Sequence, residues 1–99
     1  MNSSAEAVAR LTFGADMSVK GTITTVNIEG TAAHIHIGAT GTNGPVVISL
    51  DHTADNKWTV PDGAMLTAEQ YQAFKAGNLY VNVHSAEHKS GEIRAQLRP

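Results

Sequence analysis

Apolar and polar residues alternate with a period of two along most of the chain, and turn-forming residues interrupt the alternation at short intervals. Successive side chains of a strand point to opposite faces, so this alternation predicts strands with one buried face. The segments with this pattern are 8–13, 19–28, 31–37, 46–50, 58–60, 79–85 and 92–97. Short strands that follow one another through turns are typical of a mainly β domain.

The apolar positions of these segments define the expected core face. We expect the inward residues to include Leu11, Phe13, Ile35, Ile37, Val46, Ile48, Leu50, Leu79, Val81, Val83, Ile93, Ala95 and Leu97. In segment 19–28 the apolar residues are odd-numbered at Val19 and Ile23 but even-numbered from Val26 onwards. This change of phase predicts a β-bulge near Thr24-Thr25, which Gly21 would ease.

One helix is predicted between the strands. Thr67 is a favourable N-cap, and Gln70 three residues later completes a capping box. Leu66 before the cap can pack on Tyr71, and Gly77 ends the helix after Ala76.

Length and charge restrict the possible functions. The chain has 99 residues, which predicts one domain over 1–99, with residues 1–7 disordered or added for expression. The formal net charge is -2 and the basic residues are scattered, so we expect no nucleic-acid partner. No apolar run approaches the roughly 20 residues of a membrane span, so no membrane insertion is expected. Because Cys is absent, disulfides, thiolate ligands and cysteine nucleophiles are excluded.

The most specific chemical feature is the pair His34 and His36, with Ile35 between them. On a strand both imidazoles share one face, whereas a helix would separate them by about 200° around its axis. Segment 79–85 places His84 on the polar face, opposite its apolar residues. If the two strands pair, three imidazoles converge within reach of one transition-metal ion.

Three imidazoles with an open coordination position suit Cu(II) or Zn(II), because calcium and magnesium prefer oxygen ligands. The Irving–Williams order favours copper in a site that imposes no geometry. His88, four residues after His84, and His52, near Asp51 and Asp55, are further candidate ligands, although a surface position is expected for each. Glu92 and Arg94 are expected to form a surface ion pair or to orient an imidazole.

Several spaced motifs together resemble the CHRD domain, the module named after chordin. They run in order from about Gly21 to Leu97 and are Thr31-Ala32-Ala33-His34-Ile35-His36, Asn43-Gly44-Pro45-Val46-Val47, Leu66-Thr67-Ala68-Glu69-Gln70, Gly77-Asn78-Leu79-Tyr80-Val81-Asn82-Val83-His84 and Gly91-Glu92-Ile93-Arg94-Ala95-Gln96-Leu97. The resemblance implies an antiparallel β-sandwich or barrel-like Greek-key domain with one short helix. It also implies export to the periplasm or secretion, and it implies no established catalytic activity.

The chain departs from the family pattern in two places. Nothing before Val8 resembles the additional first strand of family members, which predicts an open sheet edge and a homodimer through it. Ile37 also stands between the histidine pair and Gly38, where the family often has Gly directly after the pair. The family's recurring histidines correspond to His34, His36 and His84.

These observations lead to three functional hypotheses. The first is an exported protein that stores, buffers or passes copper through His34, His36 and His84. The second is a structural or protein-interaction module without metal. The third is a copper redox enzyme; the His-x-His pair is locally similar to copper/zinc superoxide dismutases, but their bridging histidine and cysteines are not evident, so we expect no enzyme.

Overall fold

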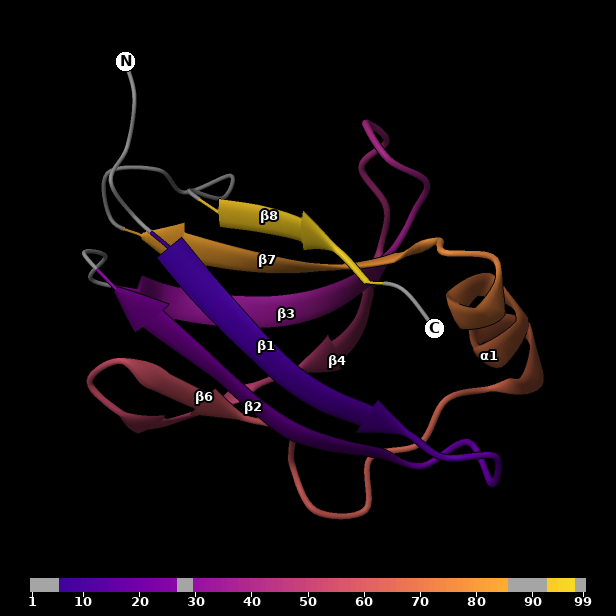
Figure 1. Ribbon diagram of the computed structural model, residues 1–99, viewed down its shortest axis with the longest axis horizontal. Helices are drawn as coiled ribbons and strands as arrows, with labels where there is room; N and C mark the ends of the chain where they lie inside the picture. Colours follow the sequence, from indigo (N-terminus) through magenta and orange to yellow (C-terminus); the bar gives the residue numbers. More distant parts are fainter. Residues whose placement is uncertain (1–5, 27–29, 86–92, 98–99) are drawn as a thin grey trace.

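The computed structural model describes residues 6–26, 30–85 and 93–97, which form two four-stranded antiparallel sheets and one helix. The first sheet has the order β1 (Glu6–Phe13), β2 (Val19–Val26), β6 (Lys57–Thr59), β5 (Asp51–Ala54). The second has the order β4 (Val46–Ser49), β3 (Gly30–Ile37), β7 (Leu79–Ser85), β8 (Ile93–Gln96). The predicted mainly β sandwich with one short helix is confirmed (Figure 1).

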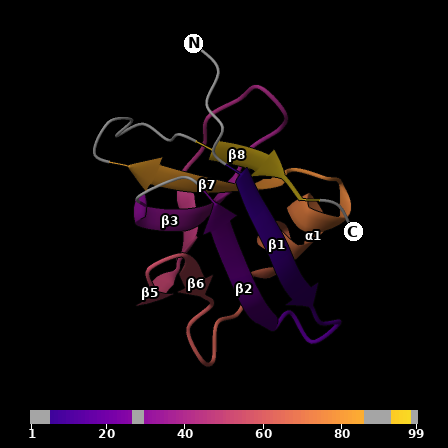
Figure 2. The same ribbon diagram turned by 60° about the vertical axis from the view of Figure 1, so that its left-hand side comes forward.

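The two sheets form two layers around one core. In Figure 2, strands β1 and β2 run across the direction of β7 and β8. The residues buried between the layers include Val19, Ile23, Ala33, Ile35, Trp58, Leu79, Val81 and Val83. The strand period therefore predicted the core face of β3 and β7 correctly.

Strand β1 begins at Glu6, which pairs with Val26. Residues 6 and 7 therefore belong to a strand, whereas disorder was predicted for them. Residues 1–5 lie outside the described part of the chain. Within the described strands, β1 is at the edge of its sheet, as expected for an open edge.

The bulge predicted near Thr24-Thr25 is wrong. The register between β1 and β2 is continuous from Phe13↔Val19 to Glu6↔Val26. Thr25 takes the inward position at 1% exposure, whereas Val26 is 45% exposed. The prediction had assigned the inward position to Val26 from its apolar character. Thr25 can be buried instead, because its hydroxyl donates to the Asn56 carbonyl at 3.4 Å.

Gly21 is nevertheless the irregular position of β2. Its φ is 133°, and a Cβ there would overlap the Arg10 carbonyl oxygen of β1. Only glycine adopts this conformation without strain while letting the neighbouring backbone approach so closely.

A bulge does occur between β3 and β4. Ile35 pairs with Ile48 and His36 pairs with Val46, which leaves Val47 as the extra residue. The predicted inward position of Val46 is therefore wrong: it is 49% exposed, while Val47 packs against the core. Ala95 of β8 is also exposed, contrary to prediction. The polar segment Asp51–Ala54 forms the additional edge strand β5.

The helix α1 (Ala68–Lys75) begins and ends as predicted. The Thr67 side chain accepts from Gln70 N at 3.1 Å, and the Gln70 side chain accepts from Thr67 N at 2.8 Å. The helix is fixed to the first sheet by Phe74, whose ring stacks on Phe13 at 4.0 Å between centroids. Among the described residues, no helix has the length and apolar character needed to cross a bilayer.

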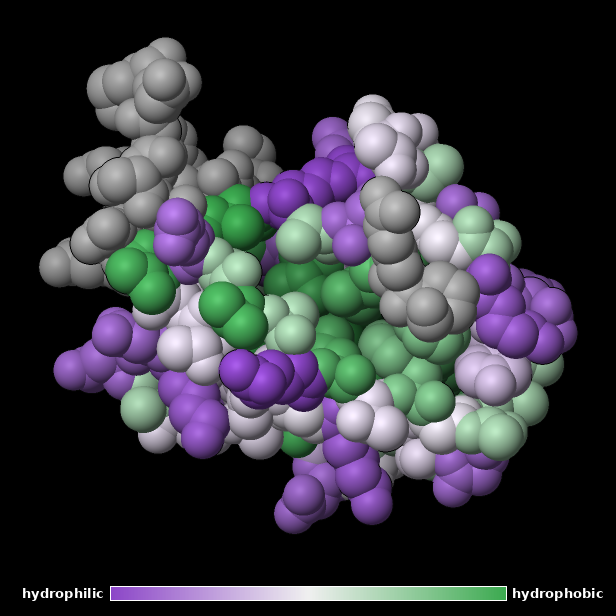
Figure 3. Space-filling model, in the orientation of Figure 1, coloured by the Kyte–Doolittle hydropathy of each residue, from purple (hydrophilic) through white to green (hydrophobic). Residues whose placement is uncertain are grey.

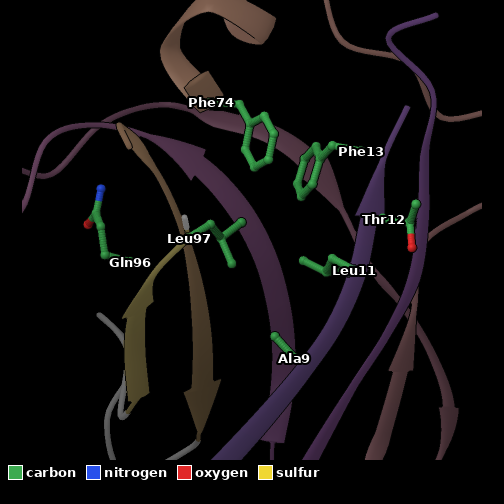
Figure 4. A pocket seen from close by; sticks show the side chains of 7 residues that line it. All are labelled: Ala9, Leu11, Thr12, Phe13, Phe74, Gln96 and Leu97. Atoms are coloured by element: carbon green, nitrogen blue, oxygen red, sulfur yellow. The ribbon is translucent and has the colours of Figure 1, made fainter. Parts of the chain in front are cut away.

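A shallow apolar groove runs between the two sheets beside the helix. Figure 3 shows apolar surface gathered in a hollow on this face of the molecule. The groove is lined mainly by apolar side chains, with two polar ones at its sides: Ala9, Leu11, Thr12 and Phe13 of β1, Phe74 of α1, Gln96 of β8 and Leu97 (Figure 4). The edge strands β1 and β8 therefore leave part of the core accessible from this side.

Candidate metal centre

Strand β3 is an inner strand of the second sheet, and its two faces have different roles. Ala33 and Ile35 are 1% and 0% exposed and pack in the core. Because side chains alternate along a strand, His34 and His36 lie on the opposite face. The same alternation on β7 directs Val81 and Val83 inward.

The pairing of β3 with β7 brings the third imidazole to the same face. His34 lies opposite Asn82, and Ala32 lies opposite His84. The ring centroids are 5.6 Å apart for His34 and His36, 5.1 Å for His34 and His84, and 6.4 Å for His36 and His84. The predicted convergence of these three side chains is confirmed.

The distances suit one metal ion after small side-chain rotations. Candidate ligand nitrogens of the three rings all lie within 4.8 Å of one another. Nitrogens that bind one tetrahedral ion at about 2 Å are roughly 3.3 Å apart. The strands therefore bring the imidazoles close to a ligand arrangement without requiring a change of register.

This face of the sheet is covered rather than fully solvated. Tyr80 and Asn82 of β7, which lie opposite His36 and His34 of β3, are 1% and 8% exposed. The loop 38–45 between β3 and β4 rises beside the ends of β7 and β8 (Figure 1). Its Gly44 N donates to the Tyr80 hydroxyl at 2.9 Å, so the loop lies against the histidine face.

One hydrogen bond favours a single tautomer of neutral His36. Its Nδ1 is 2.9 Å from the Gly44 carbonyl oxygen. A carbonyl only accepts, so Nδ1 carries the proton and Nε2 keeps a lone pair. That Nε2 is buried and has no hydrogen-bond partner in the described part of the chain, and the same holds for His34 Nδ1. Buried polar atoms normally have partners, so these two nitrogens are the features that point to a ligand.

His34 is also held in the form that binds metal. Burial lowers its pKa, and the nearby His84 and His36 lower it further. A lowered pKa keeps the imidazole neutral at pH 7, and a metal ligand must be neutral imidazole.

Of the two further candidate ligands, His52 lies apart from this cluster. His52 lies on β5, in the other sheet, and its ring stacks on Trp58 at 4.1 Å between centroids. His52 Nε2 lies 3.2 Å from the Asp55 carbonyl oxygen, so this histidine belongs to the surface of the β5–β6 hairpin. His88 and Glu92 lie outside the described residues.

Sequence reasoning named Arg94 as a residue that could orient an imidazole, but it missed the contacts that Arg94 and Tyr80 make beside the cluster. Arg94 Nη2 donates to the Ala39 carbonyl at 2.9 Å, and its guanidinium lies 3.6 Å from the centroid of the Tyr80 ring. The Tyr80 ring in turn stacks on His36 at 5.0 Å between centroids. Strand phase placed Tyr80 and Arg94 on the polar face, but no local pattern indicates that a loop covers them.

Comparison with known proteins supports the resemblance found from the motifs. The family model described as the CHRD domain matches residues 1–97 of the 99-residue chain. The match begins some twenty residues before the motifs from Gly21 onwards and includes β1. No curated protein and no solved structure shows significant similarity to the chain. By the extent of the family match, the chain belongs to the CHRD domain family.

Proposed function

We propose that this protein binds copper and stores, buffers or passes it, with His34, His36 and His84 as ligands. The observation that supports this function is the convergence of three imidazoles whose ligand atoms lie within 4.8 Å of one another. Two of these imidazoles also present a buried nitrogen without a partner among the described residues. The histidine cluster supports the copper-carrier role, and export to the periplasm or secretion is proposed from the family membership alone.

The donor set favours copper. Imidazole nitrogen is a good ligand for copper and zinc and a poor one for calcium and magnesium. Copper(II) binds such a site more tightly than zinc unless the protein imposes a geometry, so Cu(II) is the proposed metal and zinc its closest competitor. Binding is by coordination, and we expect no turnover above that of free copper.

The test is a titration of metal-free protein with Cu(II) and with Zn(II) by calorimetry, with electron paramagnetic resonance of the copper form. We expect one saturable site with nitrogen hyperfine structure in the wild type, and its loss in His36→Ala. His52→Ala is the matched control, since it removes an exposed imidazole from the other sheet. Circular dichroism checks that both variants fold. Weak, non-saturable binding to the wild type, or full affinity in His36→Ala, would overturn the proposal.

A second candidate function, compatible with a metal-free module, is self-association through β1. This strand is one of the two edges of its sheet among the described strands, and Val8 on its outer face is 51% exposed. A twofold axis at Val8 would pair two antiparallel β1 strands and continue the sheet across the interface. The same register sets Glu6 against the partner's Arg10 twice, so the charges are complementary.

Sedimentation velocity at increasing protein concentration tests this dimer. We expect association in the wild type and a monomer for Val8→Lys, because two like charges would meet at the axis. Val26→Lys is the matched control, because Val26 is 45% exposed on the neighbouring strand β2. A wild type that stays monomeric throughout would exclude this interface.

A further inference from the structure

The loop 38–45 is fastened to the end of the second sheet by two side chains of β8. Arg94 donates from Nη2 to the Ala39 carbonyl at 2.9 Å and from Nη1 to Asn43 Oδ1 at 3.3 Å. Gln96 Nε2 donates to the Gly38 carbonyl at 2.9 Å. The loop is therefore held at its start and near its end by a strand that is more than fifty residues away in sequence.

Gly44, near the far end of this loop, contacts the histidine cluster. Gly44 N donates to the Tyr80 hydroxyl at 2.9 Å, and the Gly44 carbonyl accepts from His36 Nδ1 at 2.9 Å. A Cβ at Gly44 would overlap the Ile37 carbonyl oxygen, so the loop lies directly on the end of β3. The backbone N–H and carbonyl of Gly44 thus connect a buried phenol to one imidazole.

Tyr80 connects the loop to the rest of the cluster. Its ring stacks on His36 with 5° between the planes and contacts the Arg94 guanidinium 3.6 Å from the ring centroid. Arg94 therefore acts on both parts of the arrangement: it bonds the loop and also packs on the ring beside His36. Neither residue is a member of the histidine cluster.

We propose that Arg94 and Tyr80 are positioning residues that, through Gly44, hold His36 in the single tautomer with its lone pair on Nε2. Under the proposed copper function, on which this role rests, these contacts prepare one ligand before the metal binds. Which nitrogen of an imidazole binds metal is decided by the hydrogen bond of the other nitrogen. If the Gly44 carbonyl moves away, Nε2 can take the proton and is then blocked as a ligand.

The tautomer of His36 can be measured without metal. Long-range ¹H–¹⁵N correlation spectra of the metal-free protein distinguish a protonated ring nitrogen from one with a lone pair. We expect Nδ1–H alone in the wild type, and a mixture of both tautomers in Arg94→Gln and in Tyr80→Phe. Tyr80→Phe keeps the ring on His36 and removes only the acceptor of Gly44 N. Arg10→Gln, on the exposed face of β1, is the matched control and should resemble the wild type.

Copper affinity gives the second readout. Loss of a residue that orients a metal ligand typically lowers affinity about 10- to 100-fold, so we expect that loss in Arg94→Gln and Tyr80→Phe but not in Arg10→Gln. A His36 that stays purely Nδ1–H in both variants, or that is not Nδ1–H in the wild type, would overturn the proposal. If the tautomer shifts as expected while the wild type binds no metal, the positioning is correct and the copper function is wrong.

Discussion

Tyr80 shows why the histidine face differs from an ordinary polar sheet surface. It is 1% exposed although it lies on the face away from the core, because His36, Arg94 and Gly44 surround it. Packing of this kind removes water from the neighbouring imidazoles. His34 lies on the same face, and its own burial disfavours the charged imidazole and is the main cause of its lowered pKa, to which the neighbouring His84 and His36 add.

The lowered pKa of His34 predicts that metal-free protein loses stability in mild acid. The unfolded chain, with an ordinary histidine pKa of about 6.5, binds protons more readily than the folded chain below that pH. The part of the free energy of unfolding that depends on His34 should therefore be constant above about pH 6.5. It should fall as the pH decreases from about 6.5 towards the lowered pKa of folded His34. Urea unfolding at a series of pH values between neutrality and mild acid measures this fall.

The His34→Gln variant supplies the comparison for this prediction. It lacks the titrating group, so its stability should decrease less over the same pH range than that of the wild type. Parallel pH profiles for the two proteins would show that His34 is not the group responsible.

At the scale of elements, the best predictions came from local signals. The alternation in β3 and β7 is complete within each strand, so it fixed which face holds the histidines. The capping box of α1 also depends only on Thr67 and Gln70, three residues apart. Such features can be recognised before the tertiary structure is known.

The elements that were missed depend on partners that are distant in sequence. Strand β5 has only polar or small exposed residues and exists because β6 pairs with it. Thr25 occupies a buried position because the continuous pairing with β1 leaves it no other face. The covering of the site by the loop 38–45 likewise depends on Arg94, more than fifty residues away in sequence from Ala39. Hydrophobic period gives no information about contacts of this kind.

Replacing Gly21 by Ala should displace β1 from β2. The new Cβ would overlap the Arg10 carbonyl at a φ of 133°, and strain of this kind costs about 1–3 kcal/mol before any loss of strand pairing. Gly63→Ala is the control, since Gly63 also has a positive φ, of 80°, but a Cβ added there would meet no atom within 4 Å. Urea unfolding should show a larger loss for Gly21→Ala; equal losses would contradict the role of close strand approach.

Removing the N-cap should weaken α1 without affecting the site. Thr67→Ala deletes the acceptor for Gln70 N, and such a loss typically costs about 1 kcal/mol. Thermal unfolding measures this change, and copper titration should give wild-type affinity because the histidines lie on other elements. Thr67→Ser, which keeps the hydroxyl, should retain most of the stability; an equal loss in both variants would argue against the cap.

At the scale of the whole molecule, the candidate site joins two inner strands of one sheet. His34 and His36 come from β3 and His84 from β7, and the segment between them includes the helix and three further strands. A metal ion bound to all three side chains would connect parts of the chain that separate on unfolding. Binding therefore requires the folded state and must stabilise it.

Copper should raise the unfolding temperature of the protein. At a free metal concentration 100 times Kd the gain is about 2.7 kcal/mol. For a domain of this size, that corresponds to an increase in Tm of roughly 10–20 °C. Differential scanning calorimetry with and without Cu(II) measures the shift, and His36→Ala should show none. A shift of equal size in that variant would indicate binding elsewhere.

Because both faces of β3 have a role, insertions and deletions within this strand are restricted. Ala33 and Ile35 fill the core from one face of the strand, while His34 and His36 stand on the other. Insertion or deletion of one codon within the strand would exchange the two faces, so imidazoles would enter the core and isoleucines would meet the loop. The requirements of folding alone therefore preserve the spacing of the two histidines, independently of the proposed metal binding.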